Sequence, residues 1–324
     1  MIRSRWTHLA GVATLLLVGG LAALRPMGAD ASTATTCSQS VHSDWRRNVW
    51  HHNSIAGAGD VDWARFDTAS ASWGIITLGG LTGDLSLSLY DANCHRLATS
   101  QHAGRRFEEI ARSLPAGRYY VKISGAASVY DLRFRTLSAG THVVSSRAYK
   151  DADGQLAIAG EVLNNRSSRW FVRDVTATYY DRAGRVIGHG DGAVTQSIEA
   201  AHQIRPFLLT DPFPRGYDHY RLNVSTQAPY SNYPNPARTT VQRGPTWRDP
   251  NGDVHYPGAV RNDTRSAIFG ASVMCTLYDS HGRVRYVSGG SVEPLTVPPS
   301  SSGGFDAVFG PVTGVQASLV TVRA

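Results

Sequence analysis

The sequence predicts an all-β protein made of consecutive antiparallel β-sandwich domains. A shift of 98 residues aligns positions 151–186 with 249–284 without a gap, and 14 of the 36 aligned residues are identical. The identical residues are turn and core types, which is typical of repeated structural units. Strict alternation over 85–90, where three leucines share one face, adds a clear strand pattern outside the repeat.

The N-terminal segment has the features of a secretory signal. Arg3 and Arg5 precede an apolar run over 9–24 that is short for a membrane span, and Ala29-Asp30-Ala31 fits small-x-small cleavage. We therefore predict a signal peptide over 1–31 and a secreted, extracellular or cell-envelope-associated protein. A retained membrane anchor is the alternative; after cleavage no span is expected.

Three blocks follow the signal segment. The first, 32–139, carries an N-terminal arm and alternating strands such as 119–123, with 107–113 readable as either a short helix or a strand. The repeats are placed at 140–226 and 238–324. The segment 227–237 contains three prolines and should be an extended linker. Because each repeat carries its own turns and core strands, each is expected to fold independently.

The repeated segments share one turn chemistry. Aspartates open each turn and glycines close it, for example Asp181 with Gly184 in the first repeat and Asp279 with Gly282 in the second. Capping of the turn is the preferred role of these aspartates, and metal binding is the minor alternative.

The repeats resemble the FxLYD family of small extracellular domains. Phe171 followed by TYYD at 178–181, and Phe269 followed by TLYD at 276–279, match its Phe and Leu-Tyr-Asp signature, with Tyr179 replacing Leu in the first copy. The resemblance implies immunoglobulin-like sandwiches of secreted proteins, without known catalysis.

The first block resembles the bacterial pre-peptidase C-terminal (PPC) domain. Three motifs occur in order: DVDWARF at 60–66, GDLSLSLYD at 83–91 and LPAGRYYV at 114–121. The resemblance implies a jelly-roll-like accessory sandwich of the kind found beside secreted proteases. Some relatives bind calcium near the domain start, which here would involve Asp60 or Asp62. No other cofactor is expected.

The three cysteines suit an oxidising compartment. Cys37 and Cys94 both lie in the first block outside its core strands, so we predict that they form a disulfide. Cys275 aligns with Ala177 on an inward face, which predicts a buried, inert thiol; a reactive or intermolecular thiol is the alternative.

Charge and motifs argue against several function classes. The formal net charge is +7, but the basic residues are scattered and form no stripe with interleaved aromatics, so nucleic acid is not an expected partner. No zinc-protease helix signature and no Gly-x-Ser-x-Gly elbow occurs. The sequence therefore predicts a protein that is not an enzyme.

Aromatic side chains in polar segments are the best sequence clue to binding. Trp45 and Trp50 lie in the N-terminal arm of the first block, before Asp60, and Tyr230 and Tyr233 lie in the linker. We take Trp45 and Trp50 as the candidate binding surface. The predicted function is a monomeric, non-catalytic adhesion or ligand-binding protein with an extracellular protein or polysaccharide ligand. An accessory or inhibitory module acting with a separate secreted hydrolase is the alternative, and a hydrolase with an unrecognised site ranks third.

Overall fold

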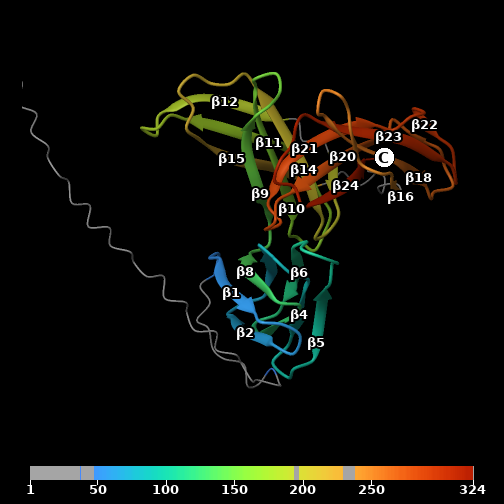
Figure 1. Cartoon of the computed structure of the whole chain (residues 1–324). Helices are drawn as coiled ribbons and strands as arrows, with labels where there is room; N and C mark the ends of the chain where they lie inside the picture. The colour runs from blue at the N-terminus through green and yellow to red at the C-terminus, as the bar shows by residue number, and fades with distance from the viewer. Residues whose placement is uncertain (1–36, 38–46, 193–196, 229–237, 324) are drawn as a thin grey trace, which may run out of the picture. The chain divides into compact units, whose positions relative to one another are not determined.

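A computed structural model describes residues 37, 47–192, 197–228 and 238–323. The predicted signal segment, Trp45 and most of the predicted linker, with Tyr230 and Tyr233, lie outside the described residues. Every element with assigned bounds is a β-strand, and all strand pairs are antiparallel, which confirms the all-β sandwich class (Figure 1). The described part of the chain contains no helix with the length and hydropathy needed to cross a membrane.

The first block consists of two four-stranded sheets. One has the strand order β1-β8-β3-β6 and the other β2-β7-β4-β5. The segment that could have been a helix is strand β6, because Glu108, Ile110 and Leu114 alternate inward while the chain pairs with β3. The strands are β1 (His51–Ile55), β2 (Val61–Thr68), β3 (Ser72–Gly79), β4 (Leu85–Tyr90), β5 (Arg96–Ser100), β6 (Glu108–Leu114), β7 (Gly117–Gly125) and β8 (Ser128–Leu137).

The first repeat also has two sheets. β10 lies between β9 and β14, while β11 pairs with β15 along one edge and with β12 and β13 along the other. The strands are β9 (Thr141–Lys150), β10 (Leu156–Asn164), β11 (Trp170–Tyr180), β12 (Val186–Gly192), β13 (Ser197–Glu199), β14 (Ile204–Asp211) and β15 (His219–Gln227).

The second repeat reproduces this arrangement. β18 lies between β23 and the pair β16 and β17, and β20 lies between β21 and β24, with β19 pairing with β22. The strands are β16 (Thr239–Arg243), β17 (Trp247–Arg248), β18 (Val254–Asn262), β19 (Ile268–Phe269), β20 (Ser272–Tyr278), β21 (Val284–Ser291), β22 (Thr296–Val297), β23 (Ser302–Phe309) and β24 (Ala317–Arg323).

The 98-residue shift extends through the strand register well beyond the aligned segment. Ala177 faces Leu222 in the first repeat, and Cys275 faces Val320, 98 positions later, in the second. The loop before the last strand carries a glycine with positive φ in each copy, at Gly216 and Gly314. The repeats can therefore be compared residue by residue.

A Tyr-Asp turn occurs once in each of the three blocks. In each case the strand has a bulge at the residue before the tyrosine, and the aspartate Oδ1 accepts the N–H groups two and four residues later. The aspartates are Asp91, Asp181 and Asp279, and capping is their observed role. Each side chain satisfies donors that the tight turn would otherwise leave unpaired.

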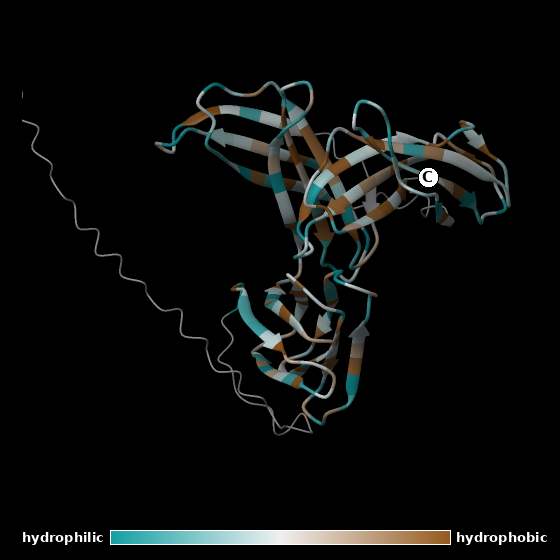
Figure 2. Cartoon of the chain, viewed as in Figure 1, coloured by the Kyte–Doolittle hydropathy of each residue, from teal (hydrophilic) through white to brown (hydrophobic). Residues whose placement is uncertain are grey.

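Each block buries its own apolar face. The first block packs leucines of β4 and β8 against Phe66 and Phe134, whose rings stack at 3.8 Å between centroids. The repeats bury the inward side chains of β10 and β11, and of β18 and β20. Figure 2 shows the resulting alternation of hydrophobic and hydrophilic residues along the strands.

A further apolar cluster lies between the repeats. Tyr278, Val284 and Val287 of the second repeat pack against Ala159 of β10 and Leu208 of β14 in the first. This contact makes β10 buried on both faces, since all nine of its residues are buried. The described residues accordingly belong to one compact unit.

Candidate functional site

The predicted aromatic arm is used, as far as the structure describes it, for internal packing. Trp50 is half-buried, with the Arg133 guanidinium 4.3 Å from its ring centroid and the His281 ring edge-on at 5.0 Å. These contacts join the first block to a turn of the second repeat. Trp45 lies outside the described residues, and ligand binding by Trp50 stays a prediction.

The same contact includes a histidine-carboxylate cluster. Asp131 lies between two imidazoles, accepting from His281 Nε2 at 2.7 Å and facing His52 Nδ1 at 3.0 Å. Gly80 N donates to the carbonyl oxygen of Ser280 beside it, at 2.9 Å. The cluster thus ties β8 to the Tyr-Asp turn of the second repeat.

The aspartates named for calcium bind protein donors. Asp60 Oδ2 accepts the Ala56 N–H at 2.7 Å, and Asp62 accepts hydrogen bonds from Asn53 and the Tyr130 hydroxyl. No group of three or more His, Cys, Asp or Glu placed to hold a metal occurs among the described residues. Calcium binding stays an untested expectation.

The cysteines have the predicted pairing. Cys37 and Cys94 are disulfide-bonded across a sequence separation of 57, with Cα atoms 5.9 Å apart. Cys275 is free and fully buried. Burial raises the pKa of its thiol to about 12, which makes the thiolate scarce at neutral pH and the side chain inert.

Two carboxyl groups meet where the three blocks join. A small cavity of about 180 Å³ is lined by Glu109 of β6, Glu161 of β10, Tyr278 of β20 and Arg135 of β8. The Tyr278 hydroxyl donates to Glu161, and the Thr77 hydroxyl donates to Glu109 at 3.0 Å. Arg135 Nη1 donates to the Val144 carbonyl at 2.6 Å, so its guanidinium also bridges two blocks.

Burial governs the ionisation of these groups. Desolvation raises the pKa of Glu161 to about 7, and it also raises the pKa of Glu109. Burial lowers the pKa of Arg135, with the two carboxylates opposing that effect. A raised carboxyl pKa is a property of many catalytic acids. Here Glu161 accepts a hydrogen bond from another block through Tyr278, whereas Glu109 accepts one from Thr77 of its own block, so the arrangement can take up protons at the junction.

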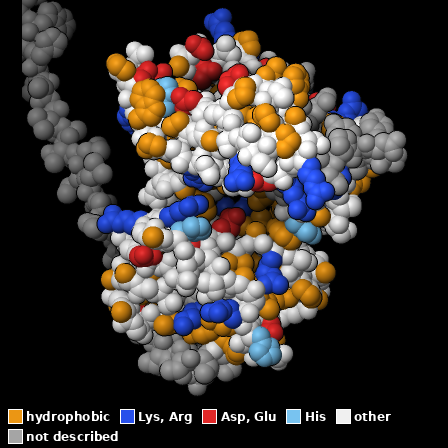
Figure 3. Space-filling view, turned by 90° about the vertical axis from the view of Figure 1, so that its right-hand side faces the viewer, with side chains coloured by type: hydrophobic (Ala, Val, Ile, Leu, Met, Phe, Trp, Pro, Cys, Tyr) orange, Lys and Arg blue, Asp and Glu red, His pale blue; other side chains and the backbone are white. Residues whose placement is uncertain are grey.

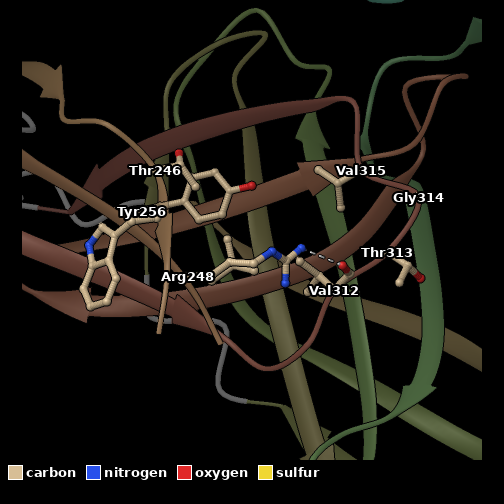
Figure 4. Close-up of a pocket in the computed structure, with 9 residues that line it drawn as sticks. Thr246, Arg248, Tyr256, Val312, Thr313, Gly314 and Val315 are labelled. Atoms are coloured by element: carbon tan, nitrogen blue, oxygen red, sulfur yellow. Dashed lines mark hydrogen bonds between the residues drawn. The ribbon is translucent and has the colours of Figure 1, made fainter. Parts of the chain in front are cut away.

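A candidate ligand site among the described residues is a hollow at one end of the second repeat. Its volume is about 550 Å³, and it lies between β17, the start of β18 and the loop that connects β23 to β24 (Figure 4). The lining includes hydroxyl, aromatic and cationic side chains together with apolar ones. The principal residues are Thr246, Arg248, Tyr256, Val312, Thr313 and Val315.

At one position that lines the hollow, the second repeat has a smaller side chain than the first repeat. At the equivalent place in the first repeat, Tyr217 packs edge-on against Phe213 and Tyr179, with centroids 5.5 and 6.1 Å apart. The Tyr220 hydroxyl lies 2.9 Å from Ser146 Oγ in the same region. In the second repeat Val315 stands at the position of Tyr217 and Ser318 at that of Tyr220. Of these two, Val315 lines the hollow, where its side chain fills less space than a tyrosine would.

Two arginines lie at the hollow. Arg248 is exposed and is held by the carbonyls of Gly252 at 3.0 Å and Val312 at 3.4 Å, as Figure 4 shows for the second contact. Arg285 Nη2 lies 3.3 Å from the position that a Cβ atom on Gly314, a lining residue, would take. Neither arginine forms an ion pair with a described residue.

An exposed aromatic stack forms part of the lining of the hollow through Trp247. Trp247 is 49% exposed, and its ring is parallel to His255 at 3.9 Å; His255 Nδ1 is in turn 2.6 Å from Asp306 Oδ2. Sequence reasoning missed Trp247, although the repeat offered a signal. The 98-residue shift places it on Tyr149, which packs against Tyr286 between the repeats. Trp247 is therefore exposed at a position whose equivalent in the first repeat, Tyr149, packs against the other repeat.

The Lys and Arg side chains elsewhere form no continuous surface on the face that Figure 3 shows. They are scattered among hydrophobic and uncharged side chains. This agrees with the absence of a basic stripe in the sequence.

Comparisons with known proteins give distant structural likenesses. No family model and no curated protein matches the chain. The pre-peptidase C-terminal domain of a collagenase from Bacillus anthracis is 21% identical, with a TM-score of 0.26, covering 30% of this chain and 96% of that one. A beta-glucuronidase from glycoside hydrolase family 2 is 10% identical, with a TM-score of 0.25, covering 79% of this chain and 24% of that one.

A DUF4785 family protein from Legionella pneumophila is 13% identical, with a TM-score of 0.17 and coverage of 89% of this chain and 84% of that one. With TM-scores of 0.26 or lower, none of these likenesses assigns a family or a function to this chain.

Proposed function

We propose that the chain is a secreted, non-catalytic ligand-binding protein made of a PPC-like sandwich and two FxLYD-like sandwiches. The hollow at the end of the second repeat is its ligand site. In this proposal the first block and the first repeat are a rigid support, and the second repeat carries the binding surface.

The observation that carries the proposal is the difference between the two repeats at one equivalent place. The first repeat fills it with Tyr217 and Tyr220, and the second leaves a hollow of about 550 Å³ beside exposed Arg248 and Trp247. A volume of this size falls in the range of about 300–1,000 Å³ found for small-molecule sites.

The non-catalytic part of the proposal is supported by how the reactive side chains are used. Asp91, Asp181 and Asp279 cap turns, and Asp131 and Glu161 join blocks to one another. Cys275 is buried with a raised pKa. Catalysis requires a nucleophile or metal with a base and an orienting group around an accessible substrate position. The groups named here are engaged in holding the fold.

The test is to incubate the purified mature protein with panels of polysaccharides, peptidoglycan and secreted proteins, with and without calcium. Binding and bond cleavage are measured in parallel. Retention of the intact protein on at least one panel member, with no cleavage products, is the expected result.

The variant Val315→Tyr provides the matched control, since it restores the aromatic residue of the first repeat. It should lose retention while keeping the wild-type unfolding midpoint or exceeding it. Cleavage that persists after repurification, and is lost on one Ser, His, Asp or Glu substitution, would refute the proposal. Binding solely to a secreted hydrolase would instead favour the accessory-module alternative.

A further inference from the structure

We infer that the hollow of the second repeat takes an anionic sugar, a saccharide that carries carboxylate or phosphate groups. This inference rests on the proposed binding function and adds the chemical class of the ligand.

Charge is the first argument. Arg248 lines the hollow and Arg285 borders it at Gly314, while no acidic side chain lines it. Arg285 Nε is buried and has no hydrogen-bond partner within the described part of the chain. Guanidinium groups bind carboxylate and phosphate through paired, charge-assisted hydrogen bonds. An anion in the hollow would therefore find cations that no described carboxylate neutralises.

Arg248 is also held in place before any ligand binds. Its Nη1 and Nη2 donate to the carbonyls of Gly252 and Val312, which fixes the plane of the guanidinium at the mouth of the hollow. A positioned cation loses little side-chain freedom on binding, so more of the interaction energy is available for affinity.

The rest of the lining fits the sugar itself. Thr246, Tyr256 and Thr313 offer hydroxyl groups, and Val312 and Val315 offer apolar surface. In Figure 4 the Tyr256 ring and the Arg248 guanidinium extend toward the loop that carries Val312 and Val315. Sugars present apolar C–H faces edged by hydroxyl groups, which aromatic and hydroxyl side chains match together. A bare inorganic anion would leave this surface unused.

The experiment is isothermal titration calorimetry of the full mature protein with four probes. Hexagalacturonate presents carboxylates on a sugar chain, mannose 6-phosphate presents phosphate on a sugar, maltohexaose is a neutral sugar, and inorganic phosphate is an anion without a sugar. We expect binding of at least one anionic sugar, with inorganic phosphate and maltohexaose each binding more weakly by about tenfold or more.

Three variants localise the signal. Arg248→Gln should weaken binding by about tenfold or more through loss of one charged contact. Val315→Tyr should abolish binding by filling the hollow. Arg182→Gln, which removes the same charge from an exposed turn of the first repeat, should leave the affinity within about twofold of wild type.

Equal affinity for maltohexaose and hexagalacturonate would overturn the anionic class, and so would a wild-type protein that binds no probe at millimolar concentration. An equal loss of affinity in Arg248→Gln and Arg182→Gln would also overturn the inference. The anion would then be attracted by the overall charge of the protein and not by the hollow. If the polysaccharide, peptidoglycan or secreted-protein panels retain the wild-type protein and Val315→Tyr abolishes that retention, the proposed function stands even when this inference fails.

Discussion

The hydroxyl of Tyr278 in the second repeat donates a hydrogen bond to the buried carboxyl of Glu161 in the first. The tyrosine belongs to the Tyr-Asp turn, whose aspartate, Asp279, caps the chain immediately after it. One motif therefore both closes a turn and joins two domains. Arg135 of the first block faces the same carboxyl, so this contact connects all three blocks.

The first prediction concerns pH. Glu161 has a folded-state pKa of about 7 and a reference value of 4.5, so the folded protein holds this proton more tightly than the unfolded chain does. Glu161 therefore favours the folded state most below pH 4.5, where it is protonated. This contribution to the free energy of unfolding is lost as the pH rises through about 7. The variant Glu161→Gln keeps an acceptor for Tyr278 and removes the titration, and it should be more stable than wild type at pH 8 by about 3 kcal/mol.

Urea unfolding at pH 5 and pH 8 measures this effect. Glu109, whose pKa is also raised by burial, keeps some pH dependence in the variant. The matched control is Glu293→Gln at an exposed carboxyl. A difference between the two pH values that is the same in wild type and Glu161→Gln would contradict the assignment of Glu161.

The second prediction separates packing from binding at Trp50. Because its ring contacts Arg133 and His281, Trp50→Ala should lower the free energy of unfolding by about 2 kcal/mol. Ligand retention should persist under conditions in which the variant is folded. Thermal melts measure the loss of stability, and the panel assay measures ligand retention by the folded variant. Lost retention with an unchanged melting temperature would restore Trp50 as a ligand-binding residue.

The structure shows which sequence inferences were sound and why others were out of reach. The turns around Asp181 and Asp279 and the pairing of Cys37 with Cys94 follow from local rules on turn capping and compartment. The hollow could not be predicted in that way. The hollow depends on the size of the side chains at positions 217 and 315. These positions lie at the ends of sandwiches whose strands are far apart in the sequence. The role of Trp50 likewise depends on His281, 231 positions away in the chain.

A third prediction concerns the disulfide. Cys37 and Cys94 close a long loop, and in the chain-entropy model a separation of 57 residues stabilises the fold by about 4 kcal/mol. Peptide mapping without reductant should recover this pair and a free Cys275. The double variant Cys37→Ser/Cys94→Ser should melt lower than wild type, while Cys275→Ala should form the same disulfide. Any linkage that includes Cys275 would contradict the pairing.

A fourth prediction concerns the independence of the second repeat. The sequence predicts that residues 238–324 fold alone, but separating them from the first repeat would lose the buried contact between the two repeats. Tyr278, Val284 and Val287 would become exposed in the fragment. We therefore expect a cooperative transition in the fragment at a lower temperature than in a two-repeat protein. Equal melting temperatures would mean that the contact between the repeats adds no stability, and the absence of a cooperative transition would show that the repeats fold as one unit.

The last prediction tests the origin of the hollow by exchanging residues between the repeats. Tyr217→Val gives the first repeat the side chain found at Val315, which removes a partly buried ring from its contacts with Tyr179 and Phe213. It should lower the free energy of unfolding by about 2 kcal/mol. The reverse change, Val315→Tyr, adds a ring to existing space and should cost nothing or stabilise the fold. Denaturant unfolding of both variants measures the two changes in the free energy of unfolding. If Val315→Tyr destabilises the protein as much as Tyr217→Val does, the space at the end of the second repeat is not available to a side chain, and the equivalence of the two positions fails.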